Sequence, residues 1–557
     1  MINGCHFLWG AGTAPYQVEG GIINNDWDFF TSSEPIKKRI SRLTRPNIFY
    51  KNSIETFLQP AGNATKFWDP RYYEKDFDLA KDLGLNAFRI GIEWARVEPE
   101  RGHWDQEAIE HYKEMIKAMR IRGLIPVITL NHITLPLWVL TPPSNFTKRI
   151  AQNLLPRPLN DLPLGDPPPP DLYWKSLKGW ENNETVEEFI KYVERMVAEL
   201  KDQVDYWITI GEPVASVIGG GYLAGLWPPG FFLDGDRAKT ALHNLIEAHI
   251  QAYNKIKLID DIDSDEDGLS SRVGFSHLIM QVIPAKSSKI LGISTKDNIK
   301  ASKNFAYFIN EYFVNAVING EEDLNYLDTL QIKNIDSKKF IIHNDWKDKA
   351  DFIGLDYYRR VPVYFSNIVS LSSAKFVGGV PLNNLTIETN HPHGILNDLG
   401  WEVYPRGLYN SIMLIKTQCN KPILIVENGI ADKSDKYRAP FIIAHLHSIR
   451  QAINDGALVL GYLYWSFTDN YEWLDNYRPE GKFGLFSINF DSNHKNGRQY
   501  EHLNLTRHKT KGAEALQLII RESIFQSKDG VVTESAIEAA AKKFGRFAAD
   551  GSHIIQN

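Results

Sequence analysis

The chain has 557 residues, of which 43% are hydrophobic and 23% charged, a composition typical of a folded globular protein and not of a disordered one. Its 62 basic and 68 acidic residues give a net charge of −6, so no basic excess favours a nucleic-acid partner. The two cysteines, Cys5 and Cys419, exclude a disulfide framework and lack metal-site spacing, and no apolar run reaches the ~18 residues of a membrane span.

Short apolar runs recur along the chain and are separated by helical patterns. Each run is continuously apolar, which is typical of strands buried on both faces of a parallel sheet. In chain order the runs cover residues 7–12, 86–92, 125–131, 205–213, 272–279, 351–358, 423–429 and 460–467. Stretches with helical spacing between them include 69–84, 105–123, 184–202 and 438–456, the first two of which begin at Asp and end at Gly, as capped helices do.

This alternation predicts an α/β fold, a single (β/α)8 TIM barrel over residues 1–524 with elaborated loops. A doubly wound sheet is the weaker alternative, because no G-x-G-x-x-G follows the first strand. Insertions are expected near 34–66 and 142–175, the second rich in proline. Residues 525–557 form a short C-terminal extension with one helix-like stretch.

Two carboxylates stand where apolar runs end. Glu212 and Glu427 are far apart in the sequence, but the C-terminal ends of barrel strands meet on one face, where active sites lie. A buried carboxylate is costly unless it is paired or used. Hydrolysis of an acetal needs two such groups, whereas either Glu alone is equally consistent with an ion pair at the barrel rim.

The sequence around these two residues favours the first interpretation. TIGEP (209–213) and IVENG (425–429) resemble the acid/base and nucleophile motifs of glycoside hydrolase family 1, the β-glucosidase-like enzymes. The resemblance covers nearly all of residues 5–520. Further matches in the family's order are FLWGAGTAPYQVEG (7–20), LNHITLP (130–136), DFIGLDYY (351–358), GWEVYP (400–405), WSFTDNYEW (465–473) and GKFGLF (481–486).

The resemblance implies a role for each matching residue. Glu212 would be the general acid/base and Glu427 the nucleophile of a retaining mechanism with a covalent glycosyl-enzyme intermediate, and Arg89 and Tyr358 would hold Glu427 as an anion. The implied substrate is a small-molecule β-glycoside: a terminal β-D-glucoside, with β-D-galactosides and β-D-fucosides as alternatives. No cofactor or metal is implied. The implied sugar-binding residues are Gln17, His132, Trp465, Glu472, Trp473 and Phe483.

The chain departs from the family pattern at two positions. Gly211 stands where the family has the Asn that binds the sugar 2-hydroxyl, and Asp356 stands where Asn usually precedes the paired tyrosines. Asp356 is expected near Glu212, whose pKa it would raise by like-charge repulsion. Three consequences are open: a slower hydrolase, a site that admits a different 2-substituent, or a catalytically weakened protein that binds sugars or transglycosylates.

Localisation and assembly are less constrained. The first residues, MINGCHFLWGAG, lack the pattern of a secretory leader, so a cytoplasmic protein is expected, with secretion as the alternative if a leader has been trimmed. N-x-S/T sequons, most of which chance explains, occur at Asn63, Asn145, Asn183, Asn384 and Asn504. The oligomeric state is left open, and no membrane partner is expected.

Overall fold

The computed structural model describes residues 6–34, 36–37, 58–140, 176–231, 234–285, 295–323, 340–364, 380–381, 394–490 and 505–555. The expected insertion at 142–175 lies outside these residues, and the one at 34–66 is described only in part.

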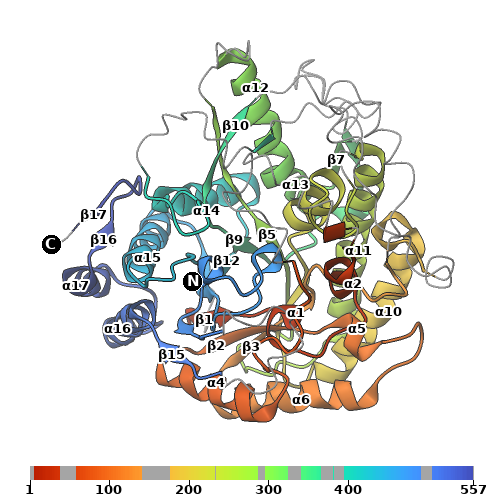
Figure 1. The fold of residues 1–557 in the computed structure, drawn as a ribbon, viewed down its shortest axis with the longest axis horizontal. Helices are drawn as coiled ribbons and strands as arrows, with labels where there is room; N and C mark the ends of the chain where they lie inside the picture. The colour runs from red at the N-terminus through yellow and green to blue at the C-terminus, as the bar shows by residue number, and fades with distance from the viewer. Residues whose placement is uncertain are drawn as a thin grey trace.

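Eight parallel strands close into a barrel at the centre of the molecule (Figure 1). The strand order is β1-β13-β12-β9-β5-β4-β3-β2, and β1 closes the ring by pairing with both β13 and β2. All eight predicted runs form these strands, which confirms the predicted (β/α)8 barrel. The strands are β1 (Leu8–Gly12), β2 (Ala87–Gly91), β3 (Ile125–Asn131), β4 (Tyr206–Gly211), β5 (Arg272–Leu278), β9 (Phe352–Asp356), β12 (Ile423–Glu427) and β13 (Val459–Trp465).

Helices surround the strands on the outside of the barrel (Figure 1). Their starts follow from the sequence, because side chains such as Asp105 accept a hydrogen bond from the first turn, here from Ala108. The longer helices around the barrel are α4 (Pro70–Asp82), α6 (Gln106–Ile121), α10 (Asn183–Leu200), α11 (Gly235–Ile259), α13 (Tyr312–Asn319), α14 (Pro405–Cys419), α15 (Arg438–Asn454) and α16 (Lys511–Gln526). Shorter helices near the strand ends are α1 (Pro15–Val18), α2 (Asp26–Ser32) and α5 (Trp94–Val97).

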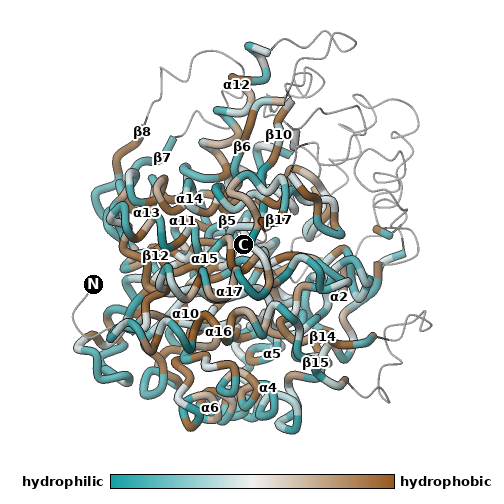
Figure 2. Tube along the Cα trace, turned by 90° about the vertical axis from the view of Figure 1, so that its left-hand side faces the viewer, coloured by the Kyte–Doolittle hydropathy of each residue, from teal (hydrophilic) through white to brown (hydrophobic). Residues whose placement is uncertain are grey.

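Two apolar cores lie on opposite faces of the barrel sheet. Successive strand residues point to opposite faces, so Tyr206 and Ile208 join a cluster made of strand side chains only, inside the barrel, whereas Trp207 joins the larger cluster shared with the helices. Hydrophobic segments accordingly gather in the middle of the chain trace (Figure 2). Burial on both faces explains why the strands are continuously apolar.

A smaller sheet continues from the ends of two barrel strands and was not predicted. β6 (Gln281–Pro284) follows β5 and pairs in parallel with β10 (Arg360–Tyr364), which follows β9 and also pairs with β11 (Val380–Pro381). With α12 (Thr295–Ala306) this sheet extends beyond the barrel at the top of Figure 1. Other two-stranded pairs join β7 (Glu321–Asp323) to β8 (Phe340–Ile342) and β14 (Phe486–Ser487) to β15 (His508–Lys509).

The C-terminal extension packs against the outside of the barrel. α17 (Glu534–Phe544) contacts α15 and α16, and β16 (Arg546–Phe547) pairs with β17 (Ile554–Ile555). The Trp9 indole donates to the Gly530 carbonyl at 2.8 Å, and the Ile395 amide donates to the Gly551 carbonyl at 2.8 Å. Gly551 has φ +71°, and a Cβ there would overlap the Val403 carbonyl, so this contact requires glycine.

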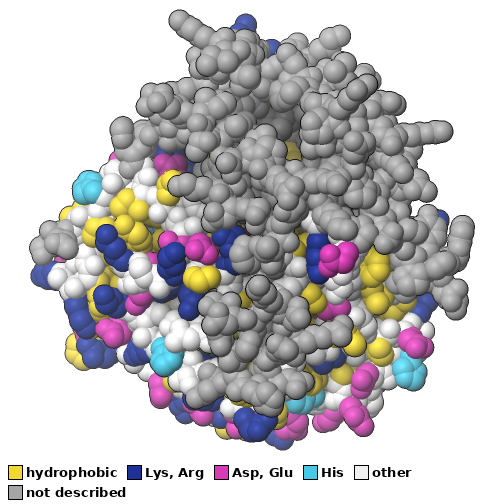
Figure 3. Space-filling view, in the orientation of Figure 1, with side chains coloured by type: hydrophobic (Ala, Val, Ile, Leu, Met, Phe, Trp, Pro, Cys, Tyr) yellow, Lys and Arg dark blue, Asp and Glu magenta, His cyan; other side chains and the backbone are white. Residues whose placement is uncertain are grey.

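The described part of the surface in Figure 3 carries basic and acidic side chains side by side, in keeping with the small net charge. Among the described helices, none combines the length and apolar character that a bilayer span demands.

Candidate active site

The residues expected to carry chemistry meet at the C-terminal ends of the barrel strands. Most are placed there because their strand ends at or just before them, and Arg89 lies two residues before the end of β2. The strand ends concerned are those of β2 (Arg89), β3 (His132), β4 (Gly211 and Glu212), β9 (Asp356 and Tyr358), β12 (Glu427) and β13 (Trp465).

Glu427 is held by two donors. Arg89 Nη1 lies 2.5 Å from Glu427 Oε1, and the Tyr358 hydroxyl donates to Oε2 at 2.8 Å. Arg89 is fully buried and its Nε donates to Thr129 Oγ1 at 2.9 Å, which fixes the guanidinium. A guanidinium and a phenol both donate to this carboxylate and fix its two oxygens in place, so it is positioned to act as a nucleophile.

Glu212 lies in a contrasting environment. Burial, and secondly the negative charge of Glu427, raise the pKa of Glu212 to about 8. Its described hydrogen-bond donor is the Ser216 hydroxyl, one turn later in the chain. The backbone of Glu212 has φ +47°, a left-handed conformation that is uncommon outside glycine and clusters at functional sites. A carboxyl that stays protonated at neutral pH can serve as a general acid.

The two glutamates lie close enough to act on one glycosidic bond. Glu212, Glu427 and Asp356 each offer a carboxylate oxygen, and these oxygens lie within 4.8 Å of one another. Retaining glycosidases place their two carboxyl groups ~5–5.5 Å apart, and inverting ones ~6.5–9.5 Å apart to admit a water. Oxygens this close are nearer to the retaining spacing than to the inverting one.

Asp356 is the third carboxyl of this centre. It is fully buried, accepts from the Ser276 hydroxyl at Oδ2, and leaves Oδ1 without a partner. Burial, and then the charges of Glu427 and Glu212, raise its pKa well above the ordinary range. The expected proximity of Asp356 to Glu212 is therefore present in the structure.

His132 presents a neutral ring to the same centre. Burial and the Arg89 charge lower its pKa well below the ordinary value. Arg89 Nη2 lies 3.3 Å from His132 Nδ1; because a guanidinium only donates, Nδ1 accepts and Nε2 carries the hydrogen. The ring is parallel to those of Trp465 and Trp473, at 6.0 and 6.1 Å between centroids.

Gln17 and Glu472 lie together next to these tryptophans. Gln17 Nε2 donates to the Tyr471 carbonyl at 2.7 Å, whereas its buried Oε1 has no partner and is free to accept from a ligand. The Trp465 indole hydrogen-bonds to Glu472, whose pKa is raised by burial and by the charge of Asp475. Together they offer several acceptors beside an aromatic surface, as a sugar requires.

An aromatic cluster packs around Tyr358. Phe483 is buried against Tyr358, at 6.1 Å between ring centroids, and against Trp401, at 6.0 Å. Phe483 therefore packs behind the phenol that binds the nucleophile.

Gly211 leaves space where a side chain would reach this centre. The atoms nearest to an added Cβ are His132 Nδ1 at 3.4 Å and the Asn131 carbonyl oxygen at 3.5 Å, both ordinary contacts. Sequence reasoning missed Ser216 and Ser276, the hydroxyls that bind Glu212 and Asp356. A signal was present for Ser216, which lies four residues after Glu212, whereas the sequence alone does not pair Ser276, on β5, with Asp356.

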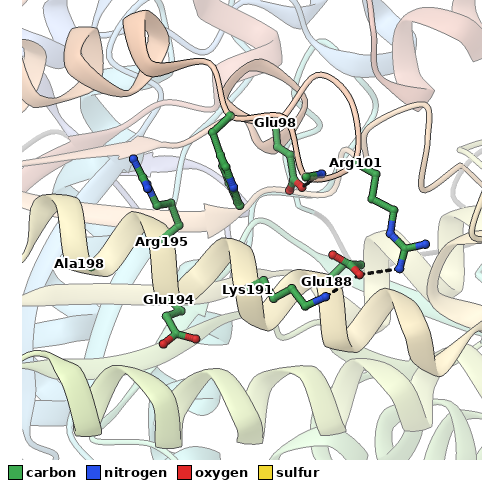
Figure 4. Close-up of a pocket in the computed structure, with 9 residues that line it drawn as sticks. Glu98, Arg101, Glu188, Lys191, Glu194, Arg195 and Ala198 are labelled. Atoms are coloured by element: carbon green, nitrogen blue, oxygen red, sulfur yellow. Dashed lines mark hydrogen bonds and ion pairs between the residues drawn. The ribbon is translucent and has the colours of Figure 1, made fainter.

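A second acidic cluster and a surface hollow lie elsewhere. Asp205, Asp263 and Asp265 bring carboxylate oxygens within 4.8 Å of one another, but both Asp205 oxygens accept from Ser264. A hollow of about 670 Å³ lies between α10 and the loop after α5 (Figure 4). In this hollow Arg101 Nη2 forms an ion pair with Glu188 at 2.6 Å, so the two charges neutralise each other.

The chain is similar to known glycoside hydrolases in sequence and in fold. The model of Glycosyl hydrolase family 1 matches residues 4–150 and 171–505. A β-galactosidase from Pyrococcus woesei is 29% identical over 537 residues, covering 87% of this chain and 92% of that protein. β-Glucosidase A from Acetivibrio thermocellus is 27% identical, covering 87% and 93%. The solved β-glycosidase from Pyrococcus horikoshii superposes with a TM-score of 0.66 at 27% identity, covering 96% of each chain. The chain therefore belongs to glycosyl hydrolase family 1 and is a glycoside hydrolase, for which the family implies a retaining mechanism.

Proposed function

We propose that the protein is a retaining β-glycosidase that hydrolyses terminal β-D-glucosides, with β-D-galactosides and β-D-fucosides as further substrates. The observation that carries the proposal is the contrast between two neighbouring carboxyls. Glu427 is bound by Arg89 and Tyr358, whereas burial raises the pKa of Glu212 to about 8. That contrast assigns one carboxyl as nucleophile and the other as acid.

The reaction follows from these roles. The Glu427 carboxylate attacks C1 of the sugar as the bond to the leaving oxygen breaks, and Glu212 gives its proton to that oxygen. Glu212, now ionised, then takes a proton from water. The water oxygen attacks C1, the bond to Glu427 breaks, and the sugar leaves with its original anomeric configuration.

Binding of the sugar is assigned to the side chains around Glu427. Gln17, His132 and Glu472 would hydrogen-bond the hydroxyls, since Gln17 Oε1 is unpaired and His132 is a neutral donor. Trp465 would lie under the ring beside Trp473. Phe483 would close the floor of the pocket behind Tyr358.

The test combines labelling with kinetics. A 2-fluoro-2-deoxy-β-D-glucoside with a good leaving group should trap a covalent sugar on Glu427, identified by peptide mass spectrometry. Wild type should release p-nitrophenol from its β-D-glucoside, and Glu427→Gln should not. Labelling of another residue would overturn the nucleophile assignment. No activity on any aryl β-glycoside would favour a sugar-binding protein instead.

A further inference from the structure

The strand residues that lie between the two catalytic glutamates include both positions at which the chain departs from the family pattern. From β4, which ends beside Glu212, to β12, which ends at Glu427, the barrel order passes through β5 and β9. Gly211 pairs with Ser276 across β4 and β5, and Asp356 pairs with Glu427 across β9 and β12. Gly211, Ser276 and Asp356 lie on the neighbouring strands β4, β5 and β9, and these three residues are here called the β4–β9 wall. The wall thus connects the acid/base to the nucleophile.

Asp356 gives this wall a free acceptor. Its Oδ2 is bound by Ser276, and its buried Oδ1 has no hydrogen-bond partner among the residues that the structure describes. An oxygen of Asp356 lies within 4.8 Å of oxygens of both Glu212 and Glu427. A buried acceptor without a partner is costly in the free protein, so a ligand that brings a donor to this point gains from satisfying it.

The wall also lacks a cation of its own. Arg89 is the cation that acts on Asp356, and it is already paired with Glu427 at 2.5 Å. His132 faces the same space but is held neutral by burial and by Arg89. An ionised Asp356 would therefore gain most from a positive charge that arrives with the ligand.

The reaction geometry places one substrate atom against this wall. In the proposed mechanism, C1 of the sugar lies between Glu212 and Glu427. Its ring neighbours are C2 and the ring oxygen, and the ring oxygen carries no hydrogen. Of the two ring atoms next to C1, only C2 can carry a donor toward Asp356, and Gly211 leaves it room, with no atom closer than 3.4 Å to an added Cβ.

We infer that the β4–β9 wall binds a positively charged substituent on C2, so that 2-amino-2-deoxy-β-D-glycosides, such as β-D-glucosaminides, are substrates. This inference rests on the proposed function and names a substrate class for the same site. An ammonium group offers three N–H donors, and its unit charge favours the ionised form of Asp356 once the ligand is bound, with the carboxyl proton passing to solvent. Hydrogen bonds that involve an ionised group are about twice as strong as neutral ones. A neutral 2-hydroxyl meets the same wall without the charge.

The experiment compares kcat/KM for p-nitrophenyl β-D-glucosaminide, β-D-glucoside and 2-acetamido-2-deoxy-β-D-glucoside, at a pH where the amine is protonated. Wild type should hydrolyse the glucosaminide, and faster than the uncharged acetamide. In Asp356→Asn the ratio of kcat/KM for the glucosaminide to kcat/KM for the glucoside should fall about 10–100-fold, which is the effect of losing one charged hydrogen bond. Using a ratio cancels any loss of folded enzyme. Ser276→Ala, which keeps the carboxylate, should lower the ratio less.

Each other outcome has a distinct meaning. Hydrolysis of the glucoside without the glucosaminide, or a ratio unchanged in Asp356→Asn, overturns the inference and leaves the proposed function intact. Equal rates on the acetamide and the glucosaminide also overturn it, because room alone would then explain both. If no glycoside is hydrolysed, the proposed function fails, and calorimetric binding still decides: the inference requires glucosamine to bind at least tenfold more tightly than glucose, and this difference to vanish in Asp356→Asn.

Discussion

Gly211→Asn should increase kcat/KM for p-nitrophenyl β-D-glucoside. The nearest atoms to a Cβ at Gly211 lie at 3.4 to 3.6 Å, so the new side chain begins without a clash, and the backbone there is not left-handed. The amide would then reach the centre formed by Glu212, Glu427 and Asp356. Hydrogen bonds to the sugar 2-hydroxyl strengthen in the transition state. A gain of about 1.4–2.8 kcal/mol from one such bond corresponds to a ~10–100-fold faster reaction.

The matched control is Gly211→Ala, which adds the same Cβ without the amide. The ratio of kcat/KM between the Asn and the Ala variant at position 211 separates the effect of the hydrogen bond from that of packing. Thermal melting checks that both variants are folded. The reasoning is refuted if Gly211→Asn is no faster than wild type, or if Gly211→Ala gains as much. The same substitution should also lower the preference for the glucosaminide, because it fills the space beside Asp356.

Three further outcomes follow from the charges. Because the reaction needs protonated Glu212, whose pKa is about 8, kcat/KM should fall as the pH rises through about 8; a pH–rate profile flat to pH 10 would contradict this. The folded-state pKa of Glu212 lies above its ordinary 4.5, so its stabilising contribution is complete below about 4.5 and lost as the pH rises through about 8. Glu212→Gln should therefore melt at a higher temperature than wild type at pH 9, with little gain at pH 4. Arg507→Ala should destabilise the fold by about 3–5 kcal/mol in urea unfolding, since it strips the fully buried Asp76 of its partner at 2.8 Å; the exposed Arg71→Ala should change little.

The barrel could be predicted from the sequence because its signals are local. Strands buried on both faces are apolar on both, and the eight runs were apolar at most positions, with no alternation, before any pairing was known. Helix starts were equally local, since Asp69 and Asp105 accept hydrogen bonds from residues two and three positions later. The gathering of Glu212 and Glu427 then followed from the rule that strand ends of a barrel share one face.

The contacts that tune the site could not be predicted in the same way. Ser276 binds Asp356 across 80 residues, and this pairing depends on the register of β5 against β9, which no local pattern in either strand fixes. The β6–β10 sheet was missed because its strands directly follow barrel strands. Their short apolar runs read as extensions of the barrel instead of as a second sheet.

The three carboxyls at the barrel mouth link the chemistry to the stability of the fold. Burial raises the pKa of both Glu212 and Asp356, while the cation beside them, Arg89, is paired with Glu427. At these two groups the folded state holds protons more tightly than the unfolded chain does, so their contribution to folding stability falls as the pH rises through their folded-state pKa values. The same burial that makes Glu212 a proton donor is thus a source of alkaline instability. A cationic group on C2 would offset the charge that forms on Asp356, so a glucosaminide-type ligand should stabilise the protein more than glucose does near neutral pH, and should lose this advantage when its amine is deprotonated at alkaline pH.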